Sequence, residues 1–188
     1  ITSLGGIAIQ RELASGNVYL QVASDLQGMM SARYYNAEGQ SVGEGTMPPE
    51  IGSSTTYRVT WTLTNALNDA AEVVLFAPLG GRADWAGLVS STQGTVSYDG
   101  VADRVRWSAG DMAAGAQPPE AVFDIKVTPT QADLNKFADI LTNGRVTAID
   151  TVTDIELSSD VRGITTELPN DPYAENQGIV QDPNAVAQ

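Results

Sequence analysis

Thr55-Thr-Tyr-Arg-Val-Thr-Trp-Thr-Leu-Thr-Asn65 is the stretch of sequence that decides the fold. Apolar and polar residues alternate strictly along it, and the apolar positions are Tyr57, Val59, Trp61 and Leu63. β-branched and aromatic residues with a period of two are typical of a β-strand with one buried face. The pattern therefore predicts a half-buried strand, with Trp61 at the centre of a core that other strands must cover.

Short apolar runs recur on both sides of this stretch, roughly every ten residues, separated by turn-forming residues. We expect strands over residues 18–26, 29–35, 71–77, 95–98, 104–107, 121–128, 145–150, 155–158 and 161–168. Gly28 interrupts the first two and indicates a bulge or bend. Even spacing without alternating helices predicts an all-β antiparallel sandwich rather than a Rossmann or barrel enzyme fold.

One short helix is expected over residues 130–141. Thr130 has the character of an N-cap, and Asp133 follows at the position of an acidic capping box. Leu134, Phe137 and Leu141 recur at helical spacing, and Asn143-Gly144 would end the helix.

Composition divides the chain into three parts. Residues 1–17 are expected to form an N-terminal arm or linker strand, residues 18–168 the sandwich, and residues 169–188, rich in Pro, Asn and Asp, an extended C-terminal tail. The sequence has no secretory signal peptide and does not begin with Met, which indicates a processed product or a piece of a longer protein.

The net charge and the absent residue types limit the partners and the mechanisms that are possible for this chain. Ten Lys and Arg against 23 Asp and Glu give a net charge of −13, which disfavours nucleic acid and anionic lipid as partners. There is no cysteine for disulfides and no histidine for a triad or most transition-metal sites. No apolar run is long enough to span a membrane, so we expect no direct membrane insertion of this segment.

Several motifs then carry a family resemblance. They are Tyr57-Arg-Val-Thr-Trp61-Thr-Leu-Thr-Asn65, Val96-Ser-Tyr98-Asp99, Arg104-Val-Arg-Trp107-Ser-Ala-Gly110, Met112-Ala-Ala-Gly115 and Phe123-Asp-Ile-Lys-Val-Thr-Pro129. In order and spacing the chain from about 18 to 180 resembles the conserved-repeat, immunoglobulin-like domain of large prokaryotic cell-surface proteins. It is most similar to a C-terminal version in surface proteins of uncultivated, small-genome bacteria, and it departs from the pattern at Leu79-Gly80, where a proline usually follows the leucine.

The resemblance implies an immunoglobulin-like β-sandwich with extended terminal arms, located extracellularly on the cell surface. It implies a non-enzymatic structural module and brings no catalytic residues. We therefore expect a building block of a surface layer, filament or stalk, whose partners are other copies or neighbouring domains of the same surface protein. The alternative is an adhesin that binds a glycan or a host or partner surface protein.

Two groups of acidic residues are candidate metal ligands, since Ca²⁺ prefers clustered oxygen ligands. The first group is Asp150, Asp154, Glu156 and Asp160, and the second is Asp99, Asp103 and Asp111. The competing interpretation is a set of solvated acidic turns in a chain with 23 acidic residues, and no cofactor is needed in that case. A hydrolase that uses two of these carboxylates is a further alternative, although no spacing selects a pair.

Aromatic residues are the candidate ligand-binding groups. Trp61 and Trp107 alternate with strand hydrophobes and are expected in the core, whereas Trp85 lies between Asp84 and Gly87 and is the better surface candidate. Tyr34 and Tyr35 place one ring on each face of their strand, so one of the two rings is expected at the surface.

The N-terminal arm is the candidate assembly element. Ile7, Ile9 and Leu13 alternate with other residues and can form a strand. Such a strand can add to an exposed sheet edge of another copy, where it would satisfy unpaired N–H and C=O groups. It can equally pack on its own domain, and the sequence favours neither arrangement.

Overall fold

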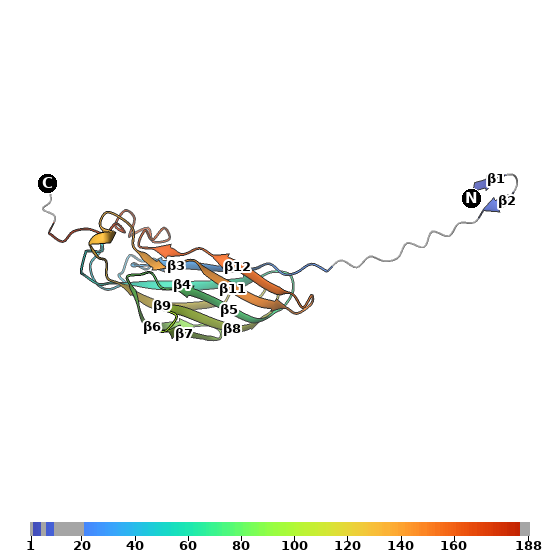
Figure 1. The fold of residues 1–188 in the computed structure, drawn as a ribbon, viewed down its shortest axis with the longest axis horizontal. Helices are drawn as coiled ribbons and strands as arrows, with labels where there is room; N and C mark the ends of the chain where they lie inside the picture. Colours follow the sequence, from blue (N-terminus) through green and yellow to red (C-terminus); the bar gives the residue numbers. More distant parts are fainter. Residues whose placement is uncertain (1, 5–6, 10–20, 185–188) are drawn as a thin grey trace.

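The computed structural model describes residues 2–4, 7–9 and 21–184, and it confirms the all-β antiparallel sandwich of immunoglobulin-like type (Figure 1). One sheet has the strand order β3-β4-β9-β6 and the other has the order β12-β11-β5-β8-β7. The strands of the first sheet are β3 (Leu26–Arg33), β4 (Thr55–Asn65), β6 (Ala83–Ser91) and β9 (Glu120–Val127). The strands of the second sheet are β5 (Ala70–Pro78), β7 (Thr95–Asp99), β8 (Arg104–Met112), β11 (Gly144–Asp150) and β12 (Glu156–Val161).

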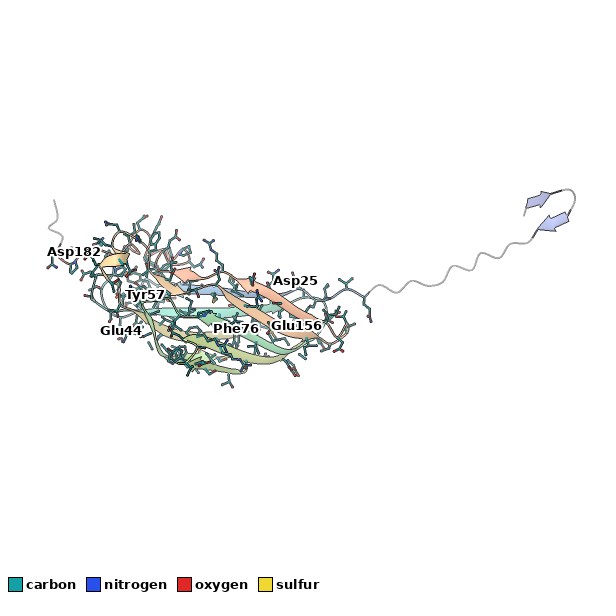
Figure 2. The ribbon with its side chains drawn as sticks, viewed as in Figure 1. Asp25, Glu44, Tyr57, Phe76, Glu156 and Asp182 are labelled. Atoms are coloured by element: carbon teal, nitrogen blue, oxygen red, sulfur yellow. The ribbon has the colours of Figure 1, made fainter. Side chains whose placement is uncertain are left out.

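Strand β4 lies in the interior of its sheet, as its alternation predicts. It pairs with β3 on one side and β9 on the other, and its apolar face is fully buried. Trp61 packs edge-on against Phe123, with ring centroids 5.0 Å apart and planes at 89°. Tyr57 lies in the interior (Figure 2), and burial raises the pKa of its phenol above the ordinary value.

Strand β3 differs from the sequence-based expectations in two respects, which are where it begins and how it continues through Gly28. It begins at Leu26, and residues 21–25 before it are not in a strand. Gly28 pairs with Leu63 inside an unbroken register, so the expected bulge is wrong. A Cβ atom at Gly28 would lie 2.9 Å from Cγ2 of Val161 in the opposite sheet. The glycine therefore allows close approach of two sheets rather than a bend in one.

The helix expected over residues 130–141 is reduced to one 3₁₀ turn, Gln131–Asp133. The capping box is present, because the Asp133 carboxylate accepts hydrogen bonds from the N–H and hydroxyl of Thr130. Asn135 then adopts a left-handed backbone (φ 61°), and its N–H donates to the carbonyl of Val180. Pairing with a distant segment thus replaces the hydrogen bonds that would continue a helix.

The rest of that segment forms strand β10 (Asp139–Leu141), which pairs with β13 (Ile164–Thr165) in a small two-stranded sheet. Residues 169–184 fold against this end of the sandwich, and Ala174 and Val180 are fully buried. They are therefore not the extended tail that their composition suggested. The domain boundaries themselves stay predictions.

Strands β1 (Thr2–Leu4) and β2 (Ile7–Ile9) form a separate antiparallel two-stranded sheet. Of the assembly residues expected from the sequence, Ile7 and Ile9 belong to β2, and Leu13 lies outside the described residues. No helix in the described part of the chain is long and apolar enough to cross a membrane.

Candidate functional site

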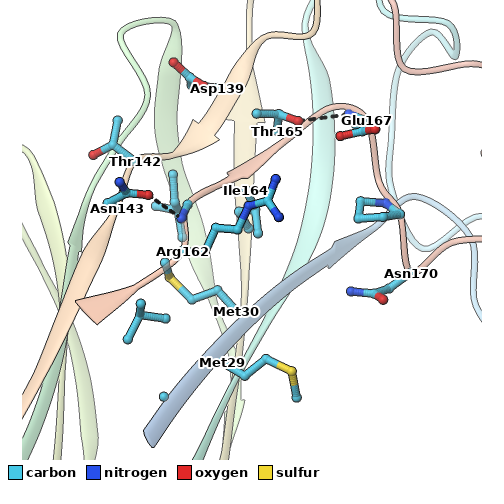
Figure 3. Close-up of a pocket in the computed structure, with 15 residues that line it drawn as sticks. Met29, Met30, Asp139, Thr142, Asn143, Arg162, Ile164, Thr165, Glu167 and Asn170 are labelled. Carbon is cyan, nitrogen blue, oxygen red and sulfur yellow. Dashed lines mark hydrogen bonds between the residues drawn. The ribbon is translucent and has the colours of Figure 1, made fainter. Parts of the chain in front are cut away.

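A cavity of about 700 Å³ opens beside β3. It lies on the side of the sandwich where β3 and β12, which are edge strands of the two sheets, come close to each other. Its walls come from β3, from the end of β12 with the loop that follows, and from β10 and β13. Figure 3 shows Met29 and Met30 on β3, with Arg162 and Ile164 across the opening. We call this feature the β3 groove and define it by Gly28, Met29, Met30, Val161, Arg162 and Ile164.

The β3 groove has an apolar floor and a polar rim. Met30 is buried, whereas Met29 on the opposite face of the strand is 62% exposed. Arg162 is exposed and has no ion pair among the described residues. Strand β3 pairs only with β4 in the described part of the chain. The backbone N–H and C=O groups along its other edge, beside the groove, therefore have no strand partner among the described residues.

Asp150, the first candidate metal ligand, is fully buried at the end of β11. One carboxylate oxygen accepts hydrogen bonds from the Ser24 N–H (2.7 Å) and the Asn68 amide (2.9 Å), and the other accepts from the N–H groups of Val152 and Thr153. Burial alone would raise the pKa of Asp150, but these donors together lower it well below the ordinary value. Both oxygens are thus occupied by structural hydrogen bonds.

The other three residues of this group do not join Asp150. Asp160 forms an ion pair with Arg145 at 2.9 Å. Asp154 and Glu156 line a hollow of about 330 Å³ with Glu72. Within residues 2–4, 7–9 and 21–184 no three acidic side chains are close enough to hold a metal ion together. Calcium binding here stays a prediction that this geometry does not favour.

The residues of the second acidic group also accept structural hydrogen bonds, and Asp111 accepts one from the N–H of Glu72 at 3.2 Å. Asp99 accepts hydrogen bonds from the N–H groups of Ala102 and Val101, which lower its pKa. Asp103 accepts the phenol hydrogen of Tyr98 at 2.8 Å. Asp99 and Asp103 therefore stabilise the turn between β7 and β8.

The tyrosine pair expected as a ligand platform is mostly structural. Tyr34 is 7% exposed and donates its hydroxyl hydrogen to the carbonyl of Gly45 at 2.8 Å. Tyr35 is half-buried between Tyr34 and Tyr173, with edge-on contacts to both rings. Both rings thus have structural contacts, and ligand binding by this pair stays a prediction.

Trp85 on β6 is half-buried and stacks on Tyr98 of β7, with ring centroids 6.0 Å apart and planes at 4°. Tyr98 is 37% exposed, and its hydrogen bond to Asp103 raises the pKa of the phenol. Sequence reasoning missed this partner, because the two aromatic residues lie on edge strands of different sheets. Only the packing of β6 near β7, across the two sheets, brings them together.

In the described part of the chain, the carboxyl groups with a clearly shifted pKa do not suit the role of a general acid. A carboxyl group that must donate a proton near neutral pH needs a raised pKa. The carboxyl groups whose pKa clearly departs from the ordinary value, Asp99, Asp133 and Asp150, are all shifted downward. The described residues therefore give the hydrolase alternative no support.

Comparison with solved structures gives distant similarities. The full-length major pilin SpaD from Corynebacterium diphtheriae matches with a TM-score of 0.46 and 13% identity, over 75% of this chain and 35% of that chain. A 35 kDa C-terminal fragment of the major pilin GBS80 of Streptococcus agalactiae matches with a TM-score of 0.44 and 8% identity, over 75% and 55%. A GH20 exo β-N-acetylglucosaminidase from Vibrio harveyi matches with a TM-score of 0.34 and 8% identity, over 72% and 17%.

This chain spans about a third of the length of SpaD and about half of the GBS80 fragment. At these identities and TM-scores the likeness concerns the sandwich fold alone and carries no argument about activity. No protein-family model matches the chain, and no curated protein sequence does.

Proposed function

We propose that this chain is a non-enzymatic structural module of a prokaryotic cell surface. It serves as a building block of a surface layer, filament or stalk, and its copies join through β-strand contacts. This function rests on the sequence resemblance to immunoglobulin-like surface repeats and on the physical features of the sandwich. The chain is extracellular, and its partners are other copies or neighbouring domains.

The observation that carries the proposal is the separate β1–β2 sheet. Each of its strands has three residues, and within the described residues they pair only with each other. An isolated two-stranded hairpin is marginally stable at best in water, because it has too little surface to bury. These strands therefore gain stability from a third strand, which an edge of another copy can supply.

Light scattering and negative-stain electron microscopy test the proposal on the whole 188-residue chain. The informative variant is Ala8→Pro, which removes a backbone donor in the middle of β2. Ala8→Val is the matched control, since valine keeps the N–H and favours a strand. We expect wild type and Ala8→Val to form larger particles as concentration rises, and Ala8→Pro to remain monomeric. A wild-type chain that is monomeric at every concentration would refute the proposal.

A second function has one specific observation in its favour. The stacked Trp85 and Tyr98 rings form a partly exposed aromatic surface, and sugar rings stack on surfaces of this kind. An adhesin role would use this surface to bind a glycan. Trp85→Ala should then abolish binding on a glycan array, while Leu88→Ala, which removes another exposed side chain from β6, should not. Binding that survives Trp85→Ala would remove this alternative.

A further inference from the structure

We propose that the outer edge of β3, with the β3 groove beside it, accepts strand β2 of a second copy as an added strand. The inference rests on the proposed function, since it names the acceptor for the strand contact that joins the copies. It also assigns the occupant, which is the segment Ile7–Ile9 of a neighbouring chain.

Four strands lie at the edges of the two main sheets of the sandwich, and β3 is the one best suited to accept a partner. Strand β6 is broken by two register shifts, which twist an edge and hinder pairing. Strand β7 has five residues and ends in Asp99, and β12 has six residues and carries Glu156 and Asp160. Strand β3 has eight residues in unbroken register, and its only charged residue is the terminal Arg33.

Apolar side chains lie beside that edge, within a cavity whose lining also includes polar residues such as Asp139, Asn143 and Glu167. Gly28 and Met30 point toward the sandwich interior from β3, and Val161 and Ile164 approach from the other side of the groove. At Gly28 the floor of the groove is closed by Val161, because a Cβ atom there would lie 2.9 Å from Cγ2 of that residue. A strand added to β3 would place alternate side chains over this floor.

Strand β2 has matching chemistry. Residues 1–10 contain no charged side chain, so their entry into the groove carries no charge-desolvation cost. In any strand residues 7 and 9 share one face and residue 8 takes the other. Ile7 and Ile9 would therefore cover the floor of the groove, and Ala8 would lie on the outer face with Met29.

The occupant comes from another copy because, within one chain, β2 pairs with β1 and the edge of β3 has no strand partner in the described residues. The connecting residues 10–25 number 16. Fully extended they would span at most about 55 Å, which is enough to reach a neighbouring sandwich. Each copy then has one donor strand and one different acceptor edge, and head-to-tail contacts of this kind produce open filaments.

Cysteine cross-linking tests the acceptor directly, because the native chain has no cysteine. One protein carries Ala8→Cys. A second, size-tagged protein carries Gln27→Cys, Met29→Cys or Ser31→Cys, one at a time, on the outer face of β3. Mixed and oxidised, only contacts between two copies give a disulfide of the hybrid mass.

The matched control places the cysteine at Leu88, an exposed position on the bulged edge β6 of the same sheet. We expect at least one β3 position to give several-fold more hybrid product than Leu88→Cys. Thermal unfolding of each variant confirms that the sandwich is intact. Equal yields at β3 and β6, or no hybrid product at any β3 position, would overturn the inference.

The same samples separate this inference from the proposed function. Particles that still assemble without cross-links at β3 would leave strand-mediated assembly standing and refute the acceptor. A chain that neither assembles nor cross-links would refute both. A double variant Ala8→Cys/Met29→Cys that forms only an internal disulfide in a monomer would show that the occupant is the chain's own strand, which contradicts the inference.

Discussion

Replacing Asp171 by alanine should show that the C-terminal segment is part of the folded domain. Asp171 is buried, and one of its carboxylate oxygens accepts the N–H groups of Tyr34 (2.8 Å) and Tyr35 (2.7 Å), just after β3 ends. The other oxygen accepts the N–H groups of Tyr173 (3.1 Å) and Ala174 (3.2 Å). A single side chain thus joins two segments that are far apart in sequence.

The magnitude follows from the four donors that Asp171→Ala leaves without an acceptor. A hydrogen bond to a charged group contributes about 1.5–3 kcal/mol, and an unsatisfied buried donor costs about 1–3 kcal/mol. The two donors within the C-terminal segment can turn toward water, whereas the amide of the buried residue Tyr34 cannot do so easily. We therefore expect the free energy of unfolding to fall by about 3–5 kcal/mol.

Urea denaturation of the whole chain, followed by tryptophan fluorescence, measures the loss. Glu175→Ala is the matched control, because it removes an exposed carboxylate from the same segment, and it should change the free energy of unfolding by less than about 0.5 kcal/mol. A loss below about 1 kcal/mol for Asp171→Ala would refute the reasoning, since the carboxylate would then not anchor the segment.

Three further predictions address the core and the acidic loop. Gly28→Ala should lower the free energy of unfolding by about 1–3 kcal/mol, because the new methyl group overpacks against Val161. Adding Val161→Ala should recover part of that loss, whereas additive effects in the double-mutant cycle would contradict the close approach. The ionised Asp150 stabilises the folded state, because its folded pKa lies below the unfolded value of about 3.9, so its contribution is present above that pH and is lost as pH falls toward the folded pKa. Asp150→Asn should therefore lower stability at neutral pH and flatten the acid limb of a stability–pH curve, which Asp160→Asn should leave unchanged; parallel acid limbs for wild type and Asp150→Asn would count against this assignment. Thr166→Val should cost about 1–3 kcal/mol in urea denaturation, because the buried hydroxyl joins two backbone groups, and a neutral result would contradict that role.

The strands were predictable from the sequence because their signal is local. Alternation over residues 55–65 needs nothing beyond the pattern of side chains, and it identified both β4 and the buried face around Trp61. The strand expected over residues 71–77 is likewise present as β5, Ala70–Pro78. Edge strand β6 was not predicted, since its register shifts disturb the alternation.

The errors have a common cause, which is contact between segments distant in sequence. The apolar spacing over residues 130–141 is compatible with a helix, but the hydrogen bond between Asn135 and Val180 takes precedence. Gly28 was interpreted as a bend because its neighbour Val161 lies more than a hundred residues away in sequence. Local propensity contains no information about such partners.

The candidate sites show the same limit. The sequence suggests that the Asp150 carboxylate is a metal ligand. Only the structure reveals that it accepts hydrogen bonds from Ser24 and Asn68. Trp85 was identified as a surface aromatic, yet its stacking partner Tyr98 was not. The chain contains no histidine and no cysteine, so composition alone rules out chemistry that needs those side chains.

The most direct test of the central claim is backbone hydrogen exchange along β3 as the chain is concentrated. If copies join by adding a strand to this edge, exchange in Leu26–Arg33 slows with concentration, in step with particle size, while exchange in the other edge strand of the sheet, Ala83–Ser91, stays constant. Assembly that proceeds while exchange along Leu26–Arg33 stays unchanged would contradict the account.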